Sequence, residues 1–198
     1  MSMMEAERRR LQYVTRLEDP PVAKALFDNV NLSWLWLILR LYAGWQWIQA
    51  GGAKIGAEAW TGANAGAALT GFVRGALDQT GGAHPNVQAW YAAFLENVVL
   101  PNAAFWGYLV AWGELLVGIA LIAGLFTGIV AFFGAFMNIN YLLSGAVSTN
   151  PILLLIEIFL ILAWKTAGWW GLDRWVLPAL GTPWSPGLIF REEEVEVT

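Results

Sequence analysis

Residues 103–123 read AAFWGYLVAWGELLVGIALIA, an apolar stretch with a single charged side chain, Glu114. A helix rises 1.5 Å per residue, so about 20 such residues cross a hydrocarbon core of roughly 30 Å. Gly124 follows at once and leaves room only for a tight turn before the next apolar stretch. The sequence therefore predicts a transmembrane helix over residues 103–123.

Three further stretches of similar length and character lie at residues 32–52, 125–145 and 151–170. The whole chain is 58% hydrophobic and 13% charged, whereas about a quarter of the residues in soluble domains are charged. Tryptophans gather near the ends of the first and fourth stretches, as is typical at the headgroup level. We expect an all-α fold, an integral membrane four-helix bundle over residues 32–172. The alternative is a water-soluble bundle of very apolar helices.

The segments outside the four stretches indicate the topology. Residues 1–31 are polar and lack the early apolar core of a signal peptide, and 173–198 end in an acidic tail. Eight Lys and Arg residues lie in the N-terminal segment and at or beyond the end of the fourth stretch, against two in the 53–102 loop. The positive-inside rule then places both termini in the cytoplasm and the loop outside. Residues 11–17 and 22–30 are expected to form short interfacial helices.

The 53–102 loop is too long to be structureless in a compact domain. Residues 64–79 and 86–99 have helical apolar spacing, and Gly81 and Gly82 separate them. Pro101 is expected to end the second helix. We predict an external helical cap between the first two membrane helices, with its apolar face on the bundle.

Three charged residues, Arg40, Glu114 and Glu157, lie well inside apolar stretches, where each costs at least about 2.5–3.5 kcal/mol. Each shares a helical face with small residues, which is typical of contacts between membrane helices. Counted from the inner end, Arg40 and Glu114 lie at one depth and should pair directly. Glu157 should lie nearer the outer mouth, beside Asn138, and one carboxylate is left to hold a bound proton.

The composition excludes several kinds of chemistry. The chain has no cysteine, which removes disulfides, thiolate nucleophiles and cysteine-held metal or iron–sulfur sites. His84 is the only histidine, so we expect no metal site. No basic patch is present, so nucleic acid is not an expected partner.

Several short motifs occur in an order and spacing that resembles the DoxX family of bacterial and archaeal membrane proteins. They are LRL at 39–41 with Gly44, GGAK at 51–54, GEL at 113–115 with Gly118, GLFT at 124–127, then Asn138, Tyr141, Ser144 and NP at 150–151. The resemblance covers about residues 32–172. It implies a four-helix protein of the cytoplasmic membrane, related to the DoxD-type small subunit of thiosulfate:quinone oxidoreductase.

The resemblance implies a subunit of a quinone-linked oxidoreductase system that binds a quinone or small anion and works with a redox partner subunit. Without cysteine or a built-in cofactor motif the chain cannot exchange thiols itself, and the sequence leaves open whether it is an enzyme. The alternatives are a transporter and a scaffold in a larger complex, and a homo-oligomer is compatible with either. The candidate ligand- or proton-binding residues are Arg40, Trp47, Lys54, Glu114, Asn138 and Glu157. In the competing interpretation the membrane charges only fix helix register.

Overall fold

The computed structural model describes residues 19–182, and every regular element in that range is helical, which confirms the all-α class for these residues. The elements, in chain order, are α2 (Pro21–Ala23), η1 (Lys24–Asp28), η2 (Val30–Leu32), α3 (Ser33–Ile55), α4 (Glu58–Thr61), α5 (Ala67–Leu77), α6 (Ala89–Phe94), η3 (Leu95–Val99), η4 (Leu100–Asn102), α7 (Ala103–Ala123), α8 (Thr127–Leu143), α9 (Asn150–Leu162), α10 (Trp164–Ala167) and α11 (Asp173–Ala179).

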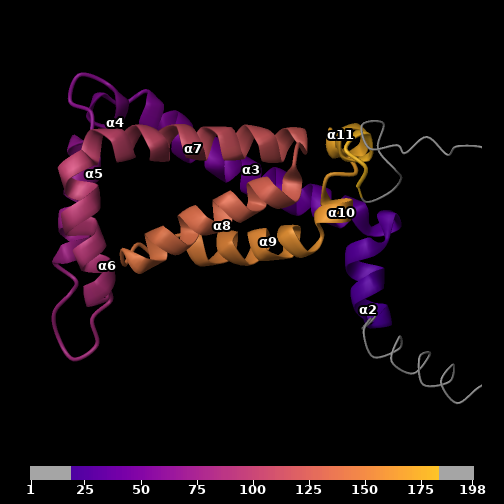
Figure 1. The fold of residues 1–198 in the computed structure, drawn as a ribbon, viewed down its shortest axis with the longest axis horizontal. Coiled ribbons are helices and arrows are strands. Elements are labelled where there is room, and N and C mark those ends of the chain that lie inside the picture. Colours follow the sequence, from indigo (N-terminus) through magenta and orange to yellow (C-terminus); the bar gives the residue numbers. More distant parts are fainter. Residues whose placement is uncertain (1–18, 183–198) are drawn as a thin grey trace, which may run out of the picture.

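The four longest of these helices, α3, α7, α8 and α9, form the body of the molecule (Figure 1). Helices α4, α5 and α6 lie at one end of this body, and α2, α10 and α11 lie at the opposite end (Figure 1). The expected helical cap between the first two long helices is therefore present. The helix expected at 22–30 appears as α2 and η1, whereas residues 11–17 and the acidic tail lie outside the described residues.

Glycines bring α3 and α7 into close contact. A Cβ atom on Gly51 would lie 2.4 Å from the backbone nitrogen of Leu115, and one on Gly118 would lie 2.6 Å from that of Ile48. No larger residue fits at such distances, and membrane helices commonly pack through small residues in this way. The faces predicted to meet between the first two long helices do meet.

A tight turn joins α7 to α8, with Gly124 and Phe126 both in the left-handed region at φ 65° and 49°. From this turn α8 diverges from α7 toward the capped end of the molecule (Figure 1). α9 returns along α8 at close range, and a Cβ atom on Gly134 would collide with the carboxylate of Glu157. The α3–α7 pair and the α8–α9 pair therefore separate where they reach the cap.

The cap has a small apolar core of its own. Its buried side chains come from α5, α6, η3 and the segment between them: Leu69, Val73, Ala76, Val87, Tyr91, Leu95 and Val99. The helices predicted at 64–79 and 86–99 correspond to α5 and to α6 with η3. The second helix ends at Val99, before Pro101 as expected, and a 3₁₀ turn at Leu100–Asn102 joins it to α7 without an intervening loop. The chain changes direction there (Figure 1).

Within the described residues, one continuous helical stretch, Ala89–Ala123, is long and apolar enough to cross a membrane. The helices α8 and α9 are apolar but shorter, with 17 and 13 residues. The fourth predicted stretch, 151–170, is corrected: α9 ends at Leu162, and α10 follows after a break at Ala163. The chain after this break turns back against the α7–α8 turn, where the carbonyl of Trp170 meets Arg40.

Candidate functional site

A cluster of Lys54, Glu114 and Tyr141 joins α3, α7 and α8 at the capped end. The Lys54 ammonium donates to Oε2 of Glu114 at 2.6 Å, and the Tyr141 hydroxyl donates to Oε1. The Glu114 side chain is 1% exposed and that of Lys54 is 18% exposed. Lys54 also lies 5.2 Å from the centre of the Trp60 ring on α4. Both carboxylate oxygens are thus occupied, and the ion pair is nearly dry on its acidic side.

This cluster forms part of the wall of a cavity of about 510 Å³, which we call the polar cavity. Its lining comes from α3, the cap, α7, α8 and the segment that leads into α9: Gln46, Trp47, Gln49, Ala50, Lys54, Trp60, Phe72, Glu114, Tyr141, Ala146, Ser148, Thr149, Asn150 and Leu153. Amides, hydroxyls and one ion pair therefore face aromatic rings across a single space.

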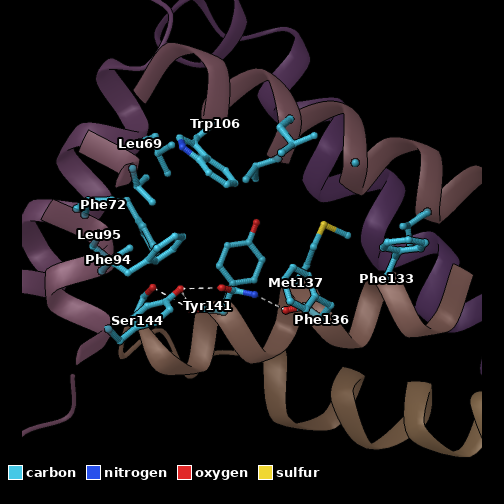
Figure 2. Close-up of a pocket in the computed structure, with 18 of the residues that line it drawn as sticks. Leu69, Phe72, Phe94, Leu95, Trp106, Phe133, Phe136, Met137, Tyr141 and Ser144 are labelled. Carbon is cyan, nitrogen blue, oxygen red and sulfur yellow. Dashed lines mark hydrogen bonds between the residues drawn. The ribbon is translucent and has the colours of Figure 1, made fainter. Parts of the chain in front are cut away.

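A second cavity of about 660 Å³, the apolar groove, lies between α7, α8 and the cap. Figure 2 shows Trp106 of α7 on one side, Phe72, Phe94 and Leu95 of the cap at the end, and α8 with Tyr141 on the other side. The remaining lining is almost entirely aliphatic or aromatic. Phe72 and Tyr141 line both spaces, with ring centres 6.1 Å apart, so this pair of rings stands where the two cavities adjoin.

Glu157 lies in the interior, fully buried on α9. Its carboxylate accepts hydrogen bonds from Nδ2 of Asn138 and Nε1 of Trp47, both at 2.6 Å. The predicted contact with Asn138 is confirmed. The expectation that Glu157 lies nearest the mouth is wrong, because Glu114 lines the polar cavity and Glu157 lines neither cavity. Trp47 connects the two sites, since it lines the polar cavity and donates to Glu157.

The predicted ion pair between Arg40 and Glu114 is not formed. Arg40 is fully buried and donates from Nη1 to the carbonyls of Leu121 at 2.7 Å and Ile122 at 3.2 Å. Its Nη2 donates to the carbonyl of Trp170 at 3.0 Å. The guanidinium thus satisfies carbonyls at the C-terminal end of α7, which have no partner within the helix. The prediction assumed that the inner ends of α3 and α7 lie at the same level. The glycine contacts between the two helices set a different register, which places Arg40 beside Leu121 and Ile122 instead of Glu114.

Asp173 is a buried charge that the sequence did not reveal. It is fully buried, and its carboxylate accepts the backbone N–H of Phe126 at 2.5 Å and that of Thr127 at 2.8 Å. It therefore caps the start of α8 from a distant segment, a favourable place for a negative charge. The spacing of the fourth apolar stretch gave no signal for this, because the contact depends on the break after α9.

The structure thus divides the six candidate residues into three places. Lys54, Glu114 and Trp47 line the polar cavity. Asn138 and Glu157 lie behind Trp47. Arg40 lies apart, among backbone carbonyls. The sequence motifs include Tyr141 without indicating a role for it, and no sequence signal marks Gln46 or Gln49.

Comparison with known families agrees with the motifs. The DoxX family model matches residues 35–145, which include Lys54, Glu114 and Tyr141. The chain belongs to the DoxX family. DoxX proteins are membrane proteins, so the lipid bilayer is the environment of the long apolar helices. No curated protein and no solved structure matches the chain.

Proposed function

We propose that this DoxX protein is a membrane subunit of a quinone-linked oxidoreductase system and that its polar cavity binds the quinone ring. The observation that carries the proposal is the cluster of Lys54, Glu114 and Tyr141, placed where a polar cavity adjoins an apolar one. The Lys54 ammonium has two protons beyond the one that it donates to Glu114 and can donate to a quinone carbonyl. The Glu114 carboxylate, held by the Tyr141 hydroxyl, can also accept from a hydroquinone hydroxyl. The three side chains therefore suit both redox forms of such a ring.

The dimensions and walls of the polar cavity also fit a planar ring. Its volume of about 510 Å³ lies in the range of small-molecule sites, roughly 300–1,000 Å³. Trp60 and Phe72 supply flat aromatic surfaces, against which a ring packs in stacked or edge-on geometry. Gln46 and Gln49 add amide groups at the wall that can bond a second carbonyl.

A small anion fits this cavity less well than a neutral quinone. Glu114 already neutralises the charge of Lys54, the one cationic side chain in the lining. An anion would have to compete with that carboxylate or be desolvated beside it, which is costly away from bulk water. Between the two ligands that the family resemblance implied, the electrostatics favour the quinone.

Electrons must come from elsewhere. Reduction of a quinone to a hydroquinone takes up two electrons and two protons, and this chain has no cysteine to carry electrons. A redox partner subunit would supply them, while this chain binds and orients the ring. Glu114 and Tyr141 are the groups through which a proton could reach the quinone oxygen.

The proposal includes four membrane-spanning helices, α3, α7, α8 and α9, with the cap outside and both termini in the cytoplasm. The short helices α8 and α9 would span with the help of their turn segments and of local bilayer thinning, which costs fractions of a kcal/mol per Å. The polar cavity then lies at the outer side, under the cap. Exposed aliphatic and aromatic side chains lie along the length of α7, α8 and α9, which supports a membrane-spanning position for these helices.

Titration of the purified protein in detergent with a short-chain benzoquinone tests the proposal, with quenching of tryptophan fluorescence as the signal. We expect saturable binding that Lys54→Met weakens about tenfold, the loss of roughly one hydrogen bond to a charged group. Lys165→Met is the matched control, because Lys165 forms a surface pair with Asp28. Absence of saturable binding, or equal affinities for the two variants, would refute the proposal.

A further inference from the structure

The apolar groove is larger than the polar cavity and is not explained by binding of a ring alone. We infer that the quinone enters sideways from the bilayer, between α7 and α8, and that its hydrocarbon tail lies in the apolar groove while the ring occupies the polar cavity. This inference rests on the proposed function. It commits the site to a membrane-dissolved quinone with a tail, in place of a water-soluble one that enters past the cap.

The groove opens toward the side of the molecule. Its lining includes side chains that are more than half exposed: Leu109 at 51%, Leu116 at 59%, Phe133 at 55% and Phe136 at 57%. They come from α7 and α8, the two helices that diverge from their shared turn toward the cap (Figure 1). In a bilayer this opening faces hydrocarbon, so its natural occupant comes from the lipid.

The few polar groups in the groove already have partners within the protein. The Tyr91 hydroxyl donates to Oδ1 of Asn140 at 2.9 Å, and the Ser144 hydroxyl donates to the carbonyl of Asn140 at 2.9 Å. The Tyr141 hydroxyl donates to Glu114. With these groups satisfied, the groove offers a ring oxygen no free donor, whereas it accommodates a tail without cost.

A ligand that occupies both spaces has to pass the pair Phe72 and Tyr141, which lines both of them. Their rings meet edge to face at an interplanar angle of 85°, on the cap and on α8. Phe72 forms no hydrogen bond through its ring, and rotation of such a side chain is fast compared with movement of a helix. The ring of the quinone would then reach Lys54 and Glu114 with its tail still behind it in the groove.

If the tail lies in the groove, blocking the groove sterically should affect quinone affinity more than changing the length of the tail does. A tail that leaves lipid for an apolar groove exchanges one hydrocarbon environment for another, so it gains little free energy from the move. Tail length alone should therefore change affinity little once the ligand concentration in the micelle phase is known. Filling the groove, in contrast, should expel a ligand with a tail and leave a bare ring unaffected.

Gly113 provides the position for this test. It lines the groove on α7, and a Cβ atom there would meet only the sulfur of Met137 at 3.5 Å, an ordinary contact. Gly113→Leu therefore adds a branched side chain to the groove without a backbone clash. Gly52→Leu is the matched control: Gly52 is exposed on α3, lines neither cavity, and has no atom within 4 Å of its Cβ position.

The probes are a dimethoxy-methyl-benzoquinone without a tail and the same ring with a decyl chain, titrated into detergent-solubilised protein with correction for partition into micelles. We expect Gly113→Leu to weaken binding of the decyl compound by at least about tenfold and to leave the tail-less ring within about twofold. Gly52→Leu should bind both compounds like the original protein. If Gly113→Leu weakens neither or both compounds equally, the groove does not hold the tail, and the proposed function still stands on the bare ring. If the original protein binds neither compound, both proposals fail.

Photo-cross-linking of the unsubstituted protein keeps the inference testable if Gly113→Leu fails to fold. A quinone with a diazirine at the end of its chain should label Leu109, Phe133 or Phe136, and excess decyl compound should abolish the labelling. Labelling confined to Ile152 and Leu155, on the exposed face of α9, would show that the tail lies in ordinary boundary lipid and would overturn the inference.

Discussion

Replacement of Lys54 by Met leaves Glu114 without its cation, and a double-mutant cycle can measure the consequence. The Glu114 carboxylate is 1% exposed, and it would retain only the Tyr141 hydroxyl as a donor. Loss of one partner of a buried pair costs about 3–5 kcal/mol. Because the Lys54 side chain is 18% exposed at the polar cavity, water can replace part of the lost bond, so we expect about 3 kcal/mol, the lower end of that range.

The companion change, Glu114→Gln, should cost less. The ammonium that it leaves behind borders the polar cavity and can be hydrated there, and the amide oxygen can still accept one hydrogen bond. We expect about 1–2 kcal/mol for this change. The double variant removes both charges and should lose about 2 kcal/mol rather than the sum, so that the coupling between the two positions is about 2–3 kcal/mol.

Reversible unfolding in mixed detergent micelles, followed by tryptophan fluorescence, gives the free energies for this cycle. The chain supplies a matched surface pair, Lys165 and Asp28, at 3.0 Å with side chains 38% and 35% exposed. Its coupling should be about 0–1 kcal/mol. A Lys54–Glu114 coupling no larger than that of the surface pair would refute the argument that the buried pair is formed in the membrane protein.

Three further outcomes are expected. Asp173→Asn should lower the free energy of unfolding by about 1.5–3 kcal/mol, because it removes the charged acceptor of two backbone N–H groups at the start of α8. The control, Asp28→Asn, should change the free energy of unfolding by less than about 1 kcal/mol. The same unfolding assay measures both variants. Glu157→Gln should lower the free energy of unfolding by only about 1 kcal/mol, because the unpaired Oδ1 of Asn138 can accept from the new amide after the Asn138 side chain rotates. Glu157→Leu should lower it by more. A large drop in stability for the Gln variant in thermal melts would contradict this expectation. A cysteine at Gln79 in this cysteine-free chain should react with an impermeant maleimide in intact cells, and protection of that position would place the cap inside.

The positions of the helices could be predicted well where a local signal marks their ends. The stretch 103–123 coincides with α7 at both ends, because the residues that follow leave the helix at a glycine in the left-handed region, Gly124. The fourth stretch had no such marker. Its apolar and aromatic composition continues to residue 170, whereas the helix ends at Leu162. The segment beyond it is held by contacts to Arg40 and to the start of α8, which a local window does not contain.

The sequence singled out residues that the structure brings together, but it gave Glu114 the wrong partner. Lys54, Glu114 and Trp47 were named from the sequence and line one cavity, and the Asn138–Glu157 contact followed from helical spacing. The partner of Glu114 was wrong because depth was counted from aligned helix ends. That alignment puts Arg40 level with Glu114, but Arg40 lies beside Leu121 and Ile122, seven or eight residues away, or about 11 Å along the helix.

The glycine contacts between α3 and α7 account for that shift. The backbones meet at Gly44 and Gly118 and again at Gly51 and the carbonyl of Ala111, positions where a Cβ atom would lie 3.0 Å or less from the facing backbone. Such contacts fix the register of two helices to within a residue, whereas a long cationic side chain can reach several carboxylates or carbonyls. Close packing therefore decides which charges can meet.

With the register fixed in this way, the two cations of α3 have different surroundings. Arg40 reaches the end of α7 and is held by backbone carbonyls near the Asp173 cap, which is the architectural role that the competing interpretation assigned to all of the membrane charges. Lys54 reaches Glu114 at the wall of the polar cavity. Under the proposed function the two interpretations apply to different residues: a substitution at Arg40 should affect folding, whereas one at Lys54 should affect folding and ligand binding together.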